Sequence, residues 1–213
     1  MNESEIRKIV EQVLAGLPDT GCGPCGSFPV EASARHVHLT SQAVEALFGP
    51  GAKLTCRREL SQPGEFLSDQ RVRVVTPKGE IAGVAVLGPE RAAIQAELSV
   101  TDCRTLGLSA PVNLSGDLTG AADLYLVGPC GMIEARGCAI AARAHIHMTP
   151  ADAANFGVHD GQHVKVEVEG ERPVIFGDVV VRVKESFALA MHIDFDEANA
   201  CLLGKNTRGR LAE

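Results

Sequence analysis

The chain has 213 residues, of which 45% are hydrophobic but only 4% aromatic, with 22 glycines and a net charge of −7. This length suits one domain or two small ones, and the aliphatic, glycine-rich composition favours strands and short turns over a helical bundle. The acidic balance argues against a nucleic-acid partner, and no apolar stretch approaches the ~20 residues that a membrane-spanning helix needs. Seven irregularly spaced cysteines favour a reducing cytosol over a disulfide framework.

The first predicted element is an amphipathic helix over residues 1–17, with a stripe of aliphatic residues at helical spacing. Residues 18–28 are rich in Gly and Pro and are predicted to be a flexible linker. A helix on such a tether could dock onto a partner surface or fold back onto its own domain, and periodicity favours neither. The CGPC sequence between Cys22 and Cys25 lacks the strand and helix of a redox motif, so we assign it no function.

From residue 29 onward, β-rich runs separated by Gly, Pro and Asp turns predict small β-barrels. An internal repeat runs through this region: residues 34–48 read ARHVHLTSQAVEALF, and residues 143–156 read RAHIHMTPADAANF. In both copies a His-x-His strand leads into a short helix, with Thr40 or Thr149 as its expected N-cap. We therefore expect a first half at 29–120 and a second half at 121–213, a division compatible with an exchange of strands between the halves.

Two histidine pairs share the His-x-His spacing: His36 with His38, and His145 with His147. Alternate residues of a strand share a face, so each pair can direct two imidazoles at one metal ion, while Val37 and Ile146 face the core. A catalytic metal usually keeps three protein ligands and one open position, and zinc is the default ion for a non-redox site. Candidates for the third ligand are His192 and Glu97, because each lies in an otherwise apolar run.

Several motifs resemble the PduL-type phosphate propanoyltransferases, the phosphotransacylases of bacterial microcompartments: RHVHLT, LSQPGEFLSDQRV, VLGPERAAIQAELSVTD, HIHMTP and MHIDFDEANA. The resemblance implies a mainly β fold of two linked, duplicated small β-barrels with short capping helices and a metal site between them. It implies two zinc ions, or other divalent transition metals, held by the following residues: His36, His38 and Glu97 for one ion, and His145, His147 and His192 for the other. It also implies that Arg91, whose planar guanidinium suits phosphate, faces the bound anion.

The resemblance further implies an acyltransferase that interconverts propanoyl- or acetyl-CoA and phosphate with acyl phosphate and CoA, through attack of metal-bound phosphate on the thioester. It implies a role in propanediol degradation in a microcompartment lumen, with residues 1–17 contacting shell or core enzymes, and we expect a homodimer or higher oligomer. The acyl preference stays open, because one methylene is weakly discriminated by a hydrophobic pocket. Asn113 departs from the family, whose members often carry Arg there, which leaves phosphate or CoA affinity open.

Two other classes of function remain compatible with the histidine pairs. A zinc-dependent hydrolase of thioesters or acyl phosphates would use the same metal ligands to activate water. A structural zinc protein or an adaptor for a microcompartment shell would use closed metal sites without an exchangeable position. Acyl-CoA loss measured with and without phosphate separates the transferase from the hydrolase.

Overall fold

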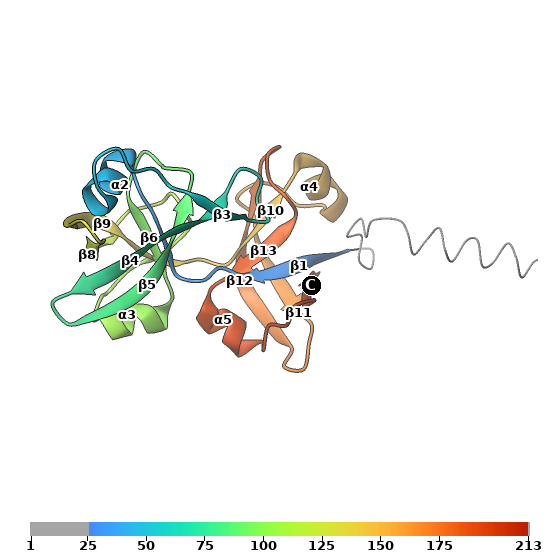
Figure 1. Cartoon of the computed structure of the whole chain (residues 1–213). Helices are drawn as coiled ribbons and strands as arrows, with labels where there is room; N and C mark the ends of the chain where they lie inside the picture. Colours follow the sequence, from blue (N-terminus) through green and yellow to red (C-terminus); the bar gives the residue numbers. More distant parts are fainter. Residues whose placement is uncertain (1–25, 213) are drawn as a thin grey trace, which may run out of the picture.

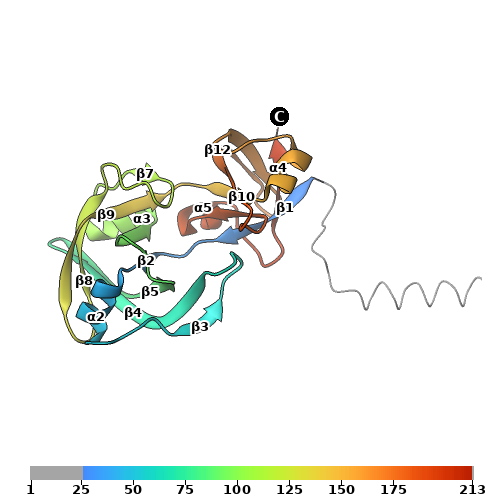
Figure 2. The same ribbon diagram turned by 90° about the horizontal axis from the view of Figure 1, so that it is seen from above.

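The computed structural model describes residues 26–212 and is mainly β. The predicted helix over residues 1–17 lies outside the described residues, and the first strand, β1 (Ser27–Ala32), begins at the end of the predicted linker. Two barrels lie side by side, with short helices at their ends (Figures 1 and 2). Within residues 26–212, no helix has the length and apolar character that crossing a membrane requires. The prediction of two duplicated β-barrels is confirmed.

The first barrel is a closed ring of strands with the order β4-β5-β2-β6-β9-β8, in which β8 pairs back with β4. Its strands are β2 (His36–His38), β4 (Phe66–Thr76), β5 (Gly79–Gly88), β6 (Gln95–Leu98), β8 (Ala122–Val127) and β9 (Met132–Ala142). Two short strands extend the sheet, β3 (Cys56–Glu59) beside β4 and β7 (Val112–Asn113) beside β9.

The second barrel is a closed ring with the order β1-β13-β10-β12-β11-β14. Besides β1, its strands are β10 (His145–Met148), β11 (His163–Val168), β12 (Val174–Val183), β13 (Ala190–Ile193) and β14 (Arg208–Ala212). After β1 the chain crosses into the first barrel, and it returns to the second between β9 and β10 (Figure 1).

The two rings have the same pairing pattern. Each His-x-His strand, β2 or β10, lies between a parallel neighbour, β5 or β12, and an antiparallel neighbour, β6 or β13. The next strand is parallel in both barrels: β9 beside β6, and β1 beside β13. β1 therefore has the place in the second barrel that β9 has in the first, so the duplicated units exchange strands along the chain.

Helices follow the equivalent strands of each barrel: α2 (Ser41–Phe48) and α4 (Pro150–Phe156) after the His-x-His strands, and α3 (Val100–Leu106) and α5 (Phe195–Ala200) after β6 and β13. The predicted N-caps are confirmed, since Thr40 accepts a hydrogen bond from the Ala43 backbone N–H and Thr149 accepts one from that of Asp152, both at 3.1 Å. Such caps satisfy otherwise unpaired N–H groups and fix where each helix begins.

The two barrels have separate hydrophobic cores, which fix the direction of the histidine side chains. Val37 and Ile146 are both 0% exposed, and each belongs to the core of its own barrel. Because strand side chains alternate between faces, the histidines on either side of them are directed out of these cores. The predicted burial of the intervening residues is confirmed.

Gly128, in the turn between β8 and β9, lies against the end of α2, where an added Cβ would be 2.3 Å from the Leu47 carbonyl oxygen. We expect Gly128→Ala to lower the free energy of unfolding by about 1–3 kcal/mol, because the helix backbone has to shift. Gly177→Ala is the matched control, since no heavy atom lies within 4 Å of its added Cβ. Urea unfolding measures both variants, and equal stability would contradict close packing between this turn and α2.

Candidate metal centre

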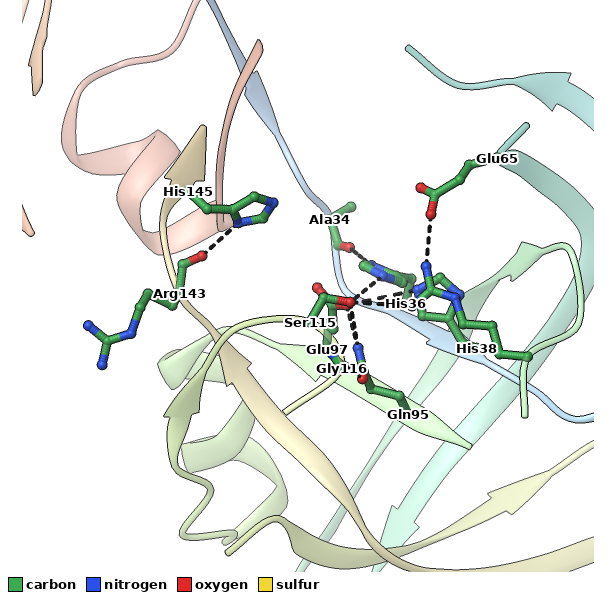
Figure 3. A network of polar contacts seen from close by, with 11 residues as sticks. Ala34, His36, His38, Glu65, Gln95, Glu97, Ser115, Gly116, Arg143 and His145 are labelled. Carbon is green, nitrogen blue, oxygen red and sulfur yellow. Dashed lines mark hydrogen bonds and ion pairs between the residues drawn. The ribbon is translucent and has the colours of Figure 1, made fainter. Parts of the chain in front are cut away.

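The first histidine pair lies on β2 beside β6, with His36 directly opposite Glu97 in the antiparallel register. The three side chains that meet here are His36, His38 and Glu97, and they are 4%, 2% and 6% exposed. They converge on one point in Figure 3. The structure therefore brings together the three residues predicted as one ligand set, two from a local motif and one from a strand much later in the chain.

The spacing within this first triad suits a shared metal ion better than direct hydrogen bonds. The Nε2 atoms of His36 and His38 lie 3.6 and 3.8 Å from Oε1 of Glu97. These distances are too long for hydrogen bonds, yet close to the roughly 3.4 Å between ligands of a tetrahedral zinc ion with bonds of about 2.1 Å. Nδ1 of His36 is hydrogen-bonded to the Ala34 carbonyl oxygen at 2.8 Å, which leaves Nε2 available as a ligand.

Glu97 and His38 of the first triad have the protonation states that a bound cation requires. Burial opposes protonation of His36, but the charge and hydrogen bond of Glu97 raise the pKa of this histidine, so a metal ion would displace a proton there. Burial opposes ionisation of Glu97, but the charge and hydrogen bond of His36, the charge of His38 and a hydrogen bond from Ser115 together outweigh burial and lower the pKa of the carboxyl group well below its usual range. Burial, with a smaller contribution from His36, lowers the pKa of His38 to about 3. A carboxylate and a neutral imidazole are the forms that bind metals.

The second triad lies at the equivalent place in the second barrel. β10 carries His145 and His147, and β13 places His192 directly opposite His145. Ring centroids are separated by 4.7 Å for His145–His147, 4.9 Å for His147–His192 and 5.4 Å for His145–His192. Burial is the main cause that lowers the pKa of His145 and of His192 to about 4, so both rings are neutral at neutral pH.

The candidate ligand atoms of the second triad are more widely spaced than those of the first. Among residues 26–212, only His36, His38 and Glu97 have candidate ligand atoms that all lie within 4.8 Å of one another. His147 has two buried ring nitrogens without hydrogen-bond partners. Nε2 of His192 lies 3.3 Å from the Gln62 side-chain nitrogen, so an amide from the first barrel contacts this triad.

A cavity of about 670 Å³ lies between the barrels and is lined by all six residues of the triads together with Arg91. The Arg91 guanidinium is oriented by Glu65, whose Oε1 accepts from Nη2 at 2.8 Å, and by Ser115, whose Oγ accepts from Nη1 at 3.3 Å. Two of its five N–H donors are thereby used, and the others are available to an anion. The structure thus places Arg91 in the same cavity as both triads.

A buried glutamine that we did not predict, Gln95, links the first triad to Ser115, which also contacts Arg91. Figure 3 shows Gln95 beside Glu97 and Ser115. The Gln95 side-chain nitrogen donates to Oε1 of Glu97 at 2.6 Å and to Oγ of Ser115 at 2.9 Å, and its oxygen accepts from the Gly116 backbone N–H at 2.9 Å. These bonds fix the amide orientation and hold the Glu97 carboxylate in place. The available sequence signal was the i, i+2 spacing of Gln95 and Glu97 on one strand, which puts them on the same face.

Asn113, the departure from the family pattern, has a local structural role. Its side-chain nitrogen donates to the carbonyl oxygens of Asp117 at 3.1 Å and Thr119 at 3.0 Å. These bonds stabilise the turn that follows Ser115 and Gly116. Asn113 therefore supports the loop that contacts Gln95 and Arg91.

Comparison with known proteins gives one consistent family. A family model described as phosphate propanoyltransferase matches residues 29–204. The chain is similar to a phosphate propanoyltransferase of Enterococcus faecalis, with 48% identity over 96% of this chain and 95% of the relative. It is 47% identical to that of Leptotrichia buccalis over 94% of both chains, and 45% identical to that of Alkaliphilus metalliredigens over 99% of both.

Proposed function

The chain belongs to the phosphate propanoyltransferase family, a family of acyltransferases, and on that premise we propose that it moves a propanoyl or acetyl group between coenzyme A and inorganic phosphate. The observation that carries this proposal is the single cavity that both triads and Arg91 line. One wall of that cavity suits a cation and another suits an anion. Such a pairing is what the reaction of phosphate with a thioester requires.

The fit of the first triad supports a divalent transition metal, with zinc as the default, held by His36, His38 and Glu97. We propose that the second triad holds another such ion, for which the unpartnered nitrogens of His147 are suited. A bound ion of this kind supplies Lewis-acid stabilisation of negative charge on a phosphoryl, carbonyl or sulfur atom. Gln95 keeps the Glu97 carboxylate oriented toward the two imidazoles.

In the proposed reaction a phosphate oxygen forms a bond to the acyl carbonyl carbon, and the carbon–sulfur bond breaks. The electron pair of that bond leaves with the thiolate of coenzyme A, and acyl phosphate is the other product. Arg91 binds the phosphate through its remaining N–H donors and stabilises charge that develops during attack. The hydrogen bonds to Glu65 and Ser115 fix its guanidinium before the substrate arrives.

The cysteines support direct attack by phosphate rather than an acyl-cysteine intermediate. Within the described part of the chain, no cysteine lines the cavity. Burial raises the pKa of Cys103 to about 11 and that of Cys138 to about 12, so neither is a thiolate at neutral pH. A buried thiol of this kind is a poor nucleophile.

We expect thiol release from propanoyl-CoA by the zinc-loaded protein to require phosphate and to yield propanoyl phosphate in equal amount. The measurement is thiol release with and without phosphate, with the acyl product trapped by hydroxylamine. The alternative, a zinc-dependent hydrolase, predicts the same rate without phosphate and a free carboxylic acid as product. Ping-pong kinetics would contradict direct attack while leaving the acyltransferase assignment in place.

A further inference from the structure

Two connecting segments of equal length occupy equivalent places in the two barrels: residues 89–94 join β5 to β6, and residues 184–189 join β12 to β13. In each barrel the strands before and after the segment pair with the second histidine of the His-x-His strand, so the two segments match position by position. The residue after Arg91, which is Ala92, therefore corresponds to Phe187. The second repeat has an aromatic ring where the first has a methyl group.

Phe187 presents apolar surface to the cavity beside the second triad. Within residues 26–212, it is the only aromatic side chain apart from histidine that lines the cavity, whereas Ala92 does not line it. Its ring centroid lies 4.1 Å from that of His147, so the ring is in contact with a candidate metal ligand. The side chain is half-buried, and the part that is exposed faces the space between the barrels.

Hydrogen bonds on both sides of Phe187 hold the ring in place. Its backbone N–H donates to the Lys184 carbonyl oxygen at 3.0 Å. The next residue, Ala188, is held by Gln62 of the first barrel, whose Oε1 accepts from the Ala188 N–H at 3.1 Å and whose Nε2 donates to the Ala188 carbonyl oxygen at 2.9 Å. The Arg182 guanidinium adds a contact at 5.7 Å from the ring centroid. The ring is therefore positioned before a substrate arrives.

A fixed apolar surface at this point needs an apolar group of the substrate to cover it. The triads and Arg91 make the rest of the centre polar, and phosphate, carbonyl oxygen and thiolate are polar as well. In the proposed reaction, the alkyl end of the acyl group is the only apolar part of the substrates that is joined directly to the reacting carbon. Contact between this alkyl end and the Phe187 ring removes apolar surface from water on both sides, which favours binding.

We propose that Phe187 forms the wall of the acyl-binding pocket and makes the enzyme selective for propanoyl over both acetyl and butanoyl groups. This inference rests on the proposed function, in which the substrate is a short acyl thioester. An acetyl group leaves part of the ring uncovered, and a butanoyl group brings one methylene too many against a ring that is held in place. The ring contacts no bond that changes, so Phe187 determines specificity and is not a catalytic residue.

The test measures kcat/KM for acetyl-, propanoyl- and butanoyl-CoA with zinc-loaded wild type, Phe187→Ala and Phe187→Trp. We expect the ratio of butanoyl to propanoyl to rise about tenfold in Phe187→Ala, because room is created, and to fall about tenfold in Phe187→Trp, because room is lost. The preference of wild type for propanoyl over acetyl should disappear in Phe187→Ala. These ratios do not depend on how much of a variant is folded, because that fraction cancels.

Thermal unfolding gives a second readout that does not depend on turnover. S-propyl- and S-butyl-coenzyme A are thioethers without a carbonyl group, so they bind without reacting. We expect S-propyl-coenzyme A to raise the Tm of wild type more than S-butyl-coenzyme A does, and the order to be reversed in Phe187→Ala. Ile175→Ala is the matched control, since it removes a 60% exposed aliphatic side chain of the same barrel that does not line the cavity, and it should leave every ratio as in wild type.

Two results would overturn the assignment of Phe187. An equal loss of kcat/KM for all three thioesters, together with weaker binding of free coenzyme A, would place the ring against the pantetheine arm, which every acyl-CoA shares. An equal loss with unchanged binding of coenzyme A would make Phe187 a structural support for His147. Phosphate-independent turnover by wild type is a separate outcome, which would reject the proposed function itself.

Discussion

Glu97→Gln is expected to lower turnover at least about a hundredfold and to reduce bound zinc by one ion per chain, if the first triad holds a metal as proposed. The change keeps the size of the side chain but removes the negative charge that faces the two imidazoles at 3.6 and 3.8 Å. It also converts the favourable hydrogen bond from Gln95 into a contact between two neutral amides. Steady-state kinetics and elemental analysis of the purified variant measure both effects.

Glu80→Gln provides the matched control for this change. Glu80 lies in the same barrel, is exposed and forms a surface ion pair with Arg73 at 3.6 Å. Such pairs contribute little, so we expect activity and zinc content to remain as in wild type. If Glu97→Gln kept its full zinc content, Glu97 would not be a ligand, and the close approach of the three side chains would reflect packing alone.

Sequence periodicity was sufficient to predict the two barrels because each half carries its own local signals. The His-x-His strands, the threonine caps and the turns are encoded by neighbouring residues, and they fold as predicted. The assignment of strands to barrels depends instead on long-range pairing. β8 and β9 close the first barrel, while β1, from the start of the described chain, pairs with β13 and β14 of the second. No local pattern of β1 specifies which barrel it joins.

The same distinction between local and long-range information applies to the site. Strand periodicity alone directs His36 and His38 to one face, whereas the third residue of each triad is fixed by register. The antiparallel pairing places Glu97 opposite His36 and His192 opposite His145, so the two acquire equivalent positions in the repeat. Gln95 has no such counterpart, because the position paired with His147 in the second barrel holds Ala190, whereas Gln95 is paired with His38 in the first. Repeat comparison therefore could not identify Gln95 as part of the site.

His147 differs from His145 and His36 in that its ring nitrogens have no hydrogen-bond partner, which affects the stability of the fold. Both of its ring nitrogens are buried without hydrogen-bond partners, whereas Nδ1 of His145 is bonded to the Arg143 carbonyl oxygen at 2.9 Å. Its pKa is lowered, first by burial and then by His145, so the ring is neutral and its lone pair is available. A buried polar group without a partner destabilises the fold by about 1–3 kcal/mol. His147 therefore lowers the stability of the metal-free protein, and this cost is offset only if a bound ligand contacts one of its ring nitrogens.

We therefore expect His147→Leu to have opposite effects on the metal-free and zinc-loaded protein. Without metal, the variant should unfold at the same temperature as wild type or higher, because the unpartnered nitrogens are gone. With zinc, wild type should gain stability from both ions and the variant from one, and turnover should fall at least about a hundredfold. His159→Leu, at an exposed position of a turn, should alter none of these quantities. A His147→Leu protein with the wild-type zinc content would limit the metal centre to the first triad.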